Sequence, residues 1–369
     1  MKYPSPKKIL VIQTHDIGDV MLSTALCNAL KDAYPQAQVD MMTMSHCAGV
    51  VESNPNITEI IILDKKRRDS LRYVYEFLMS IRARKYDVIV NMQGQIVGLL
   101  TCLFSRSSRR IGENKFPWRY AHSDNMVLPG SAEPSGEGNA VDVRFAMIAS
   151  LLPKPTNRIY KIWLSEAELQ AAAQPLREAG VDSDKPLIAF AVNARDAYKQ
   201  WPLEYFAQIA CWLMDTYGLQ IYVFFGPGEE EYSKRLKRLI PEDKRYLMFD
   251  DIRTRSIREL AAMFPHCALY VGNDTGPRHI AQAVGLPAFA IVSPASNKWG
   301  WAPWDNPRYR AVDSGDALGL SSDEWLAIRS KLRAGVNDAD WFAKLDADFV
   351  QARVQEMIEE LELFAESAD

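Results

Sequence analysis

The sequence predicts an α/β protein with two doubly wound, Rossmann-like domains that face one another across a cleft. Short apolar runs that lack in/out alternation, such as residues 9–12 and 187–192, are separated by segments with helical periodicity. Such runs are typical of parallel strands that helices cover on both faces. The pattern starts again near residue 187, and 369 residues exceed the length of one typical core. These observations together favour two successive parallel sheets.

The first half alternates strands with helices. A helix from residue 20 should stop before Tyr34-Pro35, because proline cannot continue a helix and restricts the residue before it. Two further helical patterns occupy residues 70–83 and 139–152. The strands expected between these helices are residues 9–12, 39–42, 59–63 and 87–92.

The second half repeats this order and is followed by a long amphipathic pattern at residues 341–364. Its expected helices are residues 166–179, 203–217 and a segment that starts at Glu229. Its expected strands are residues 187–192, 220–225, 268–271 and 288–292. The domains are therefore assigned as an N-terminal domain at 1–165, a C-terminal domain at 166–340, and a terminal helix at 341–369.

Composition excludes several classes of protein. A net charge of −4 and a pI near 5.9 give no overall argument for nucleic-acid binding, although basic clusters occur at residues 65–68 and 106–110. The five cysteines are scattered, and the five histidines lack metal-ligand spacing, so we expect no metal. No run is long enough for a signal peptide or a membrane span. We expect a cytoplasmic protein.

The segment 272–279 is the most informative loop. It follows an apolar run and opens a helical pattern, with Asp274 or Thr275 as the N-cap and Gly276 allowing a ligand close to the backbone. Pro277 suits the start of a helix. The free N–H groups of a helix N-terminus favour a phosphate, although an ordinary capped helix explains the pattern equally well.

A second loop, residues 13–19, follows the first strand. Gly18 permits a tight turn, and Asp19 would cap the helix that begins at Val20. The alternative for Asp19 is a general base that points into the cleft. The loop lacks the glycine fingerprint of dinucleotide-binding enzymes, which counts against a dehydrogenase.

Two more loops follow strands of the second half. Lys199 and Arg195 could donate to a diphosphate, or they could be solvated surface charges. The turn at residues 226–231 places Glu229 where a carboxylate could accept the hydroxyls of a ribose. Acidic residues in a first helical turn are also favoured by the helix dipole alone.

Taken together, these loops resemble glycosyltransferase family 9, the ADP-heptose:lipopolysaccharide heptosyltransferases. The likeness spans roughly residues 8–300. It is carried, in family order, by the Ile-Gly-Asp-Val turn at 17–20, the segment 86–94, Lys199-Gln200-Trp201-Pro202, Gly-Pro-Gly-Glu at 226–229 and the segment 272–279.

The resemblance implies a GT-B fold whose C-terminal helix packs back on the N-terminal domain. It also implies an inverting, general-base-assisted single displacement that moves heptose from ADP-L-glycero-D-manno-heptose to the inner core of lipopolysaccharide, with no cofactor or metal. Asp19 matches the base. The donor-binding matches are Lys199 and Thr275, Gly276 and His279 for the phosphates, Asp274 for the sugar, and Glu229 for the nucleoside.

The acceptor is then the core and lipid A part of lipopolysaccharide, met at the inner face of the inner membrane of a Gram-negative cell. His15 would contact this acceptor or be a satisfied loop histidine. Gly18 and Arg278 are further acceptor candidates, the latter toward a phosphate. The alternatives are a GT-B transferase or epimerase that uses a UDP-sugar or another ADP-sugar, and an inactive nucleotide-binding relative.

Overall fold

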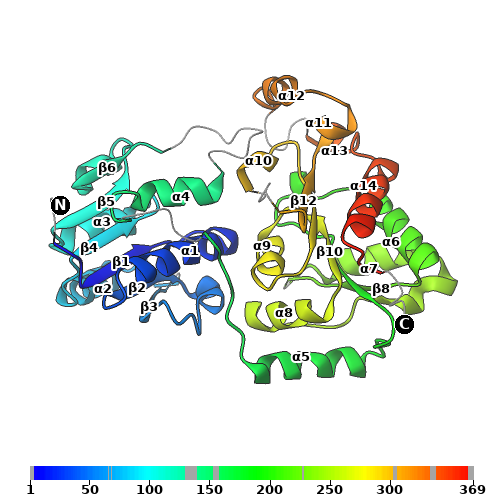
Figure 1. Ribbon diagram of the computed structural model, residues 1–369, viewed down its shortest axis with the longest axis horizontal. Coiled ribbons are helices and arrows are strands. Elements are labelled where there is room, and N and C mark those ends of the chain that lie inside the picture. Colours follow the sequence, from blue (N-terminus) through cyan, green and yellow to red (C-terminus); the bar gives the residue numbers. More distant parts are fainter. Residues whose placement is uncertain are drawn as a thin grey trace. The chain divides into compact units, whose positions relative to one another are not determined.

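The computed structural model divides into two compact units, the first drawn in blue to green and the second in green to red (Figure 1). The first unit ends at Trp163 and the second begins at Leu164, close to the boundary predicted at residue 165. The residues that the structure describes are 4–64, 66–67, 69–128, 139–152, 158–226, 228–301, 306–332 and 338–364.

The first unit contains a six-stranded parallel sheet in the order β3-β2-β1-β4-β5-β6. At its centre Ile9 lies opposite Val39 on one side and Val88 on the other, and all three side chains are buried. The order reverses beside β1, where a doubly wound sheet places its ligand site. The strands are β1 (Lys8–Ile12), β2 (Gln38–Met44), β3 (Glu59–Leu63), β4 (Val88–Asn91), β5 (Arg109–Glu113) and β6 (Asp124–Met126).

Helices cover both faces of this sheet. One pair that packs together is α1 (Ile17–Ala33) with α4 (Ala140–Ile148), and another is α2 (Leu71–Ala83) with α3 (Ile96–Phe104). Phe77 and Ile81 of α2 and Cys102 of α3 join Leu10 and Ile12 of β1 in one apolar cluster. Two short 3-10 turns, η1 (Ser45–Val50) and η2 (Trp118–Ala121), complete the unit.

The second unit repeats this architecture with the strand order β12-β11-β10-β7-β8-β9. Val271 at its centre lies opposite Phe190 and Phe289, and all three are fully buried. The order again reverses, here between β10 and β7. The strands are β7 (Leu187–Ala191), β8 (Gln220–Val223), β9 (Met248–Phe249), β10 (Leu269–Asn273), β11 (Ala288–Ile291) and β12 (Tyr309–Val312).

The helices of the second unit show clear local signals. A capping box joins Ser165 to Glu168 at the start of the first helix, and Gly218 ends α6 in the left-handed region at φ 64°. The helices and 3-10 turns are α5 (Glu166–Glu178), η3 (Ala197–Lys199), α6 (Leu203–Tyr217), α7 (Glu230–Leu239), η4 (Glu242–Leu247), α8 (Ile257–Met263), η5 (Phe264–His266), α9 (Gly276–Ala283), α10 (Lys298–Trp301), α11 (Ser314–Ala317), α12 (Ser322–Arg329), α13 (Asp338–Phe342) and α14 (Ala347–Glu360).

The C-terminal segment corrects the expectation of one long helix. The pattern at 341–364 forms two helices, because the Asp346 side chain accepts the Phe349 N–H and starts α14 anew. The segment belongs to the second unit. Its apolar stripe, Val350, Val354 and Met357, is fully buried in the core that α6 also enters.

No helix in the described part of the chain combines the length and the apolar character that a membrane span needs.

Candidate active site

The turn between β1 and α1 differs from the sequence-based expectation. The helix begins at Ile17 rather than at Val20, so Asp16 occupies the N-cap position and Asp19 lies in the first helical turn. Asp19 is therefore not the helix cap. Gly18 is buried within the same turn, which leaves it little surface for an acceptor. A carboxylate in a first turn is favoured by the helix dipole and remains free to serve another role.

The Asp19 carboxylate lies between the guanidinium group of Arg144 and the imidazole ring of His15. Its Oδ1 accepts a hydrogen bond from Nη2 of Arg144 at 2.6 Å, and its Oδ2 lies 3.1 Å from Nδ1 of His15. The Asp19 side chain keeps 23% of its surface exposed, and that of His15 keeps 52%. Oδ1 thus faces the buried partner, while Oδ2 faces the exposed one.

Arg144 comes from α4 and is buried. Its Nε donates to Ser23 Oγ at 3.1 Å and its Nη1 to the Ala140 carbonyl at 2.6 Å. Burial lowers the pKa of Arg144, and the Asp19 carboxylate opposes that effect. Ser23 in turn donates to the Asp19 carbonyl at 2.8 Å. The network fixes both the backbone and the carboxylate of Asp19, and sequence reasoning did not find it.

The loops that follow β1, β4 and β5 contact one another. The Thr14 hydroxyl lies 3.1 Å from Gln93 Oε1 and 3.3 Å from Gln95 Oε1. A Cβ on Gly94 would lie 2.5 Å from the Trp118 ring, so η2 packs directly on this loop. The carboxyl ends of these strands therefore form one surface, which includes the Asp19 turn.

In the second unit, Asn273 connects the loops after β7 and β10. This residue has no exposed surface. Its Oδ1 accepts the Trp201 N–H at 3.0 Å, and its Nδ2 donates to the Val192 carbonyl at 2.8 Å. Trp201 is also buried and donates from Nε1 to the Leu345 carbonyl at 2.7 Å. The loop that carries Lys199 is thereby fixed to the loop that carries Asp274.

Lys199 ends the 3-10 turn η3, and its side chain is one-third exposed. Its Nζ lies 3.1 Å from Asp196 Oδ2 and 5.4 Å from the centre of the Tyr198 ring. Burial acts to lower the pKa of Lys199, but Asp196 and Tyr198 outweigh it, and the net pKa is raised. The ammonium group is therefore charged at neutral pH and suited to meet an anion.

The turn at the start of α9 has the geometry that the sequence predicts. Thr275 is the N-cap residue, and Pro277 lies in the first helical turn just after Gly276, one position later than expected. A Cβ on Gly272 would come within 2.5 Å of the Ala191 carbonyl oxygen, which shows how closely β10 approaches β7. Thr275 and Gly276 are half-buried, so the helix N-terminus is accessible from solvent.

Arg278 does not reach outward, contrary to its expected contact with an acceptor phosphate. Its side chain is 1% exposed, and Nε donates to Asp274 Oδ1 at 2.5 Å. Its Nη2 donates to the Trp301 carbonyl at 3.1 Å and lies 3.2 Å from Nε2 of His279. Arg278 is therefore buried in an ion pair that fixes the side chain of Asp274. The spacing of four residues within a helix start signals such a pair.

His279 and Glu229 are held by neighbours in their own unit. His279 is buried, and its ring packs edge-on against Trp301 with 5.8 Å between the ring centres. The Glu229 carboxylate turns back to accept the Gly226 N–H at 2.8 Å. Gly228, at φ +86°, allows this tight turn. Glu229 is half-buried at the carboxyl end of β8.

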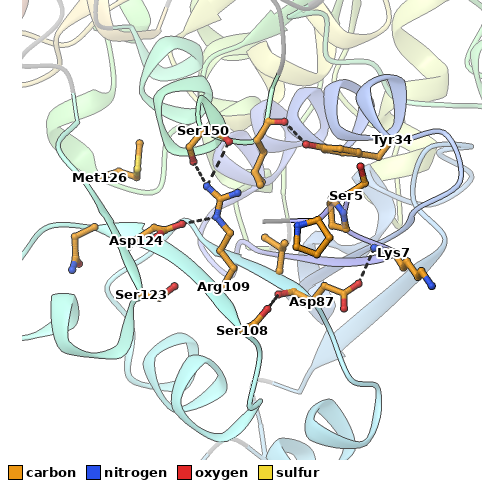
Figure 2. Close-up of a pocket in the computed structure, with 15 residues that line it drawn as sticks. Ser5, Lys7, Tyr34, Asp87, Ser108, Arg109, Ser123, Asp124, Met126 and Ser150 are labelled. Carbon is orange, nitrogen blue, oxygen red and sulfur yellow. Dashed lines mark hydrogen bonds and ion pairs between the residues drawn. The ribbon is translucent and has the colours of Figure 1, made fainter. Parts of the chain in front are cut away.

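A cavity of about 920 Å³ lies at the other edge of the first sheet. Figure 2 shows Arg109 reaching Asp124 and Ser150 there, with Nε to Asp124 Oδ2 at 2.5 Å. Lys7 donates its N–H to Asp87 Oδ2 at 2.7 Å. These residues stand at the amino ends of the strands, whereas Asp19 follows a carboxyl end. The cavity is therefore separate from the candidate active site.

The sequence is similar to curated bacterial enzymes. It is 24% identical over 305 residues to lipopolysaccharide heptosyltransferase 3 of Escherichia coli, covering 78% of this chain and 84% of that protein. It is 26% identical over 306 residues to lipopolysaccharide heptosyltransferase 2 of Salmonella typhimurium, covering 78% and 83%.

Solved structures show the same fold. The glycosyl transferase family 9 protein of Veillonella parvula matches with a TM-score of 0.78 at 21% identity, over 96% of this chain and 97% of that one. The ADP-heptose lps heptosyltransferase II of E. coli matches with a TM-score of 0.73 at 20% identity, over 96% and 99%. The predicted GT-B fold is thus confirmed.

The model of glycosyltransferase family 9 (heptosyltransferase) matches residues 74–314, well over half of the sequence. Together with the curated relatives, this match identifies the protein as a glycosyltransferase. The chain belongs to glycosyltransferase family 9, the heptosyltransferases.

Proposed function

We propose that the protein transfers heptose from ADP-L-glycero-D-manno-heptose to the inner core of lipopolysaccharide by a single inverting displacement. The names of the curated relatives support a heptose donor and a lipopolysaccharide acceptor. A structural neighbour, E. coli heptosyltransferase WaaC, was solved with ADP-2-deoxy-2-fluoro heptose, which supports an ADP-linked donor. The acceptor is anchored through lipid A, so we place the reaction at the cytoplasmic face of the inner membrane.

The observation that carries the mechanism is the placement of Asp19. A sugar hydroxyl is a poor nucleophile at neutral pH, so transfer needs a base within hydrogen-bond reach. Arg144 fixes Oδ1 of Asp19 at 2.6 Å, while Oδ2 faces the exposed His15. Oδ2 is thus the atom that takes the acceptor proton. His15, at 3.1 Å from it, then gives way to the acceptor hydroxyl or hydrogen-bonds beside it.

The second unit supplies the donor half of the reaction. The leaving group is a nucleoside diphosphate, whose developing charge is stabilised by preorganised donors. Lys199 supplies a cation, and Thr275 and Gly276 supply the helix N-terminus. Asp274, oriented by buried Arg278, accepts hydroxyls of the donor sugar. Glu229 contacts the nucleoside from the end of β8, and the backbone around His279 contributes to the phosphate site.

A transfer assay tests this function. The purified protein is incubated with ADP-heptose and heptose-deficient lipopolysaccharides of increasing core length, while ADP release and product mass are measured. We expect acceptor-dependent ADP release and a product heavier by one heptose for one core length. UDP-sugars offered in parallel should release no nucleotide.

Two other outcomes of this assay would contradict the proposal. Transfer or epimerisation from a UDP-sugar would contradict the donor assignment and leave the fold family intact. ADP-sugar binding without transfer to any acceptor would favour an inactive nucleotide-binding relative.

A further inference from the structure

A buried lysine begins α10 in the second unit. The Lys298 side chain is 4% exposed, and its Nζ lies 3.4 Å from Oδ1 of Asp313, which follows β12. The same Nζ donates to Oδ1 of Asp316 in α11. The Asp313 side chain is 1% exposed, whereas that of Asp316 is one-third exposed. We call these three residues the lysine cluster.

The carboxylate of Asp313 is itself fixed on both oxygens. Its Oδ2 accepts the indole N–H of Trp325 in α12 at 2.8 Å. Its Oδ1 accepts the backbone N–H groups of Gly315 and Asp316 at 3.0 and 3.3 Å. Trp325 is buried and packs on Gly315, where a Cβ would come within 2.5 Å of the indole ring. The lysine cluster therefore joins the start of α10 to α11 and α12.

The other end of α10 reaches the Asp274 turn. The Trp301 carbonyl accepts Nη2 of Arg278 at 3.1 Å, and Nε of Arg278 donates to Oδ1 of Asp274 at 2.5 Å. Lys298 and Trp301 are the two ends of this short helix and stand about one turn apart. A displacement of the helix at Lys298 therefore moves the carbonyl that holds Arg278, and with it the Asp274 carboxylate.

The residues just before α10 reach the loop after β7. The Ser293 hydroxyl, just beyond β11, donates to the Tyr198 carbonyl at 2.8 Å, one residue before the donor-site lysine. Nε of Arg329 in α12 donates to the Pro294 carbonyl at 3.1 Å and so holds this end of the segment. Residues 293–301 thus contact both loops that are assigned to the donor.

The lysine cluster is a costly way to stabilise a fold. Burial raises the pKa of Asp313, and the neighbouring charge of Lys298 opposes that effect. A buried ion pair contributes little net stability, and apolar side chains of similar volume often serve as well or better. A binding residue, however, needs neighbours that hold it in one geometry. The position of the lysine cluster behind Asp274 therefore favours a role in placing that residue.

We propose that Lys298 is a positioning residue for recognition of the donor sugar, acting through α10 on the Arg278–Asp274 pair. The inference rests on the proposed function, in which Asp274 accepts hydroxyls of the sugar. The phosphates of the donor meet Lys199 and the start of α9 instead. Loss of Lys298 should therefore weaken the binding of an ADP-sugar without weakening that of ADP. A displacement of about 1 Å at such a group is enough for a large effect.

Calorimetric titration of the full-length protein tests the proposal with two ligands, ADP and ADP-heptose, in the absence of acceptor. Lys298→Met should bind ADP within about twofold of wild type and ADP-heptose about tenfold more weakly. Asp313→Asn, which removes the buried counter-charge, should show the same selective loss. The double variant should lose no more than either single variant, because all three lack the same interaction.

The matched control is Lys237→Met, since Lys237 pairs with Asp250 at 2.5 Å in the last turn of α7. It should bind both ligands as wild type does. Thermal unfolding checks that each variant is folded. If Lys298→Met and Asp313→Asn do not fold, Asp316→Asn replaces them, because its side chain lies at the exposed side of the lysine cluster. It should also lower the affinity for ADP-heptose and not that for ADP.

Equal ADP-heptose affinity in wild type and Lys298→Met would overturn the proposal. An equal loss of affinity for both ligands would overturn it too, because the lysine cluster would then support the donor site as a whole. Failure of wild type to bind ADP-heptose would reject the proposed donor and this inference with it. Heptose transfer by wild type, with unchanged ADP-heptose binding by Lys298→Met, would reject the positioning role alone.

Discussion

At the scale of single residues, Asp19 depends on a partner 125 positions away in the chain. Arg144 is buried in α4, so its charge is desolvated and needs the carboxylate that it meets. No local pattern in the sequence connects these two residues. The helix at 139–152 was predicted, but which of its side chains reaches Asp19 depends on how α4 packs on α1.

Replacing Arg144 should affect turnover more than donor binding. In Arg144→Met the Asp19 carboxylate loses its fixed geometry, and we expect kcat to fall about 10- to 100-fold with the KM for the donor unchanged. Arg144→Lys should recover part of the loss. Steady-state kinetics of ADP release measure both constants. A change confined to the donor KM would contradict the positioning role.

Replacing Lys199 should weaken the binding of the donor, unlike the replacement of Arg144. A hydrogen bond to a charged group contributes about 1.5–3 kcal/mol, so Lys199→Met should lower kcat/KM about 10- to 100-fold. Calorimetric titration with ADP should show weaker binding. Lys185→Met, which removes another partly exposed lysine of the second unit, is the control and should bind ADP normally. Unchanged ADP affinity in Lys199→Met would remove Lys199 from the donor site.

The Asp274–Arg278 pair shows where residue-level reasoning failed despite an available signal. Arg278 was expected at the acceptor, yet it is buried against Asp274. The two residues stand four positions apart at a helix start, a spacing that brings side chains together. Burial of the pair, however, depends on Trp301 and on the packing of α9, which the local sequence does not specify.

At the scale of elements, α5 is joined to α8 by a bidentate ion pair. Arg258 donates from Nε and Nη2 to the two carboxylate oxygens of Glu168, at 2.5 and 2.8 Å. The Arg258 hydrogen bond lowers the pKa of Glu168 from 4.5 to about 2. A depressed carboxyl pKa stabilises the folded state above the ordinary value of 4.5, and this contribution is lost as the pH falls toward 2.

Glu168→Gln should therefore destabilise the protein in a pH-dependent way. We expect a loss of up to about 1 kcal/mol near neutral pH, because the carboxylate is partly exposed. The difference from wild type should shrink between pH 4.5 and 2. Urea unfolding across this range measures it. Glu166→Gln, on the same helix and bonded to Gln170, is the control; a similar pH dependence there would contradict the assignment.

Elements with strong local patterns were predicted, and two strands without such a pattern were missed. The strand at 59–63 and the helix at 203–217 match β3 and α6, because apolar runs and helical periodicity specify them. The charged strand β5 and the three-residue β6 lack such a pattern. The α1 start was misplaced because Asp19 and Asp16 are both acceptable caps, and tertiary contacts decide between them.

At the scale of the whole molecule, each unit has its own sheet and core. The second unit includes α5 at its start and α14 at its end, and the core cluster that contains α14 lies within it. A fragment of residues 164–369 should therefore fold cooperatively and bind ADP with an affinity near that of the full chain. Urea unfolding and calorimetry test this. A fragment that does not fold would show that the second unit needs the first.

The two-unit architecture could be predicted because the repeated strand and helix patterns are local and do not depend on how the elements pack. For the C-terminal segment, the amphipathic pattern predicts a buried face, which Val350, Val354 and Met357 form, but does not specify which core receives it. Of the candidate site, the loops were predictable from strand ends and turn residues. The Arg144 ion pair was not, since it joins two separate helices, and neither was the burial of the Arg278 pair, although its four-residue spacing is visible in the sequence.

The most direct test of the account is the activity of Asp19→Asn beside Asp16→Asn. At saturating ADP-heptose and acceptor, Asp19→Asn should lower the rate of heptose transfer by about 10²-fold or more, because the base is lost. ADP binding should be unchanged, and Asp16→Asn should stay within a few-fold of wild type. Wild-type turnover in Asp19→Asn, measured by product mass, would contradict the assignment of Asp19 as the general base.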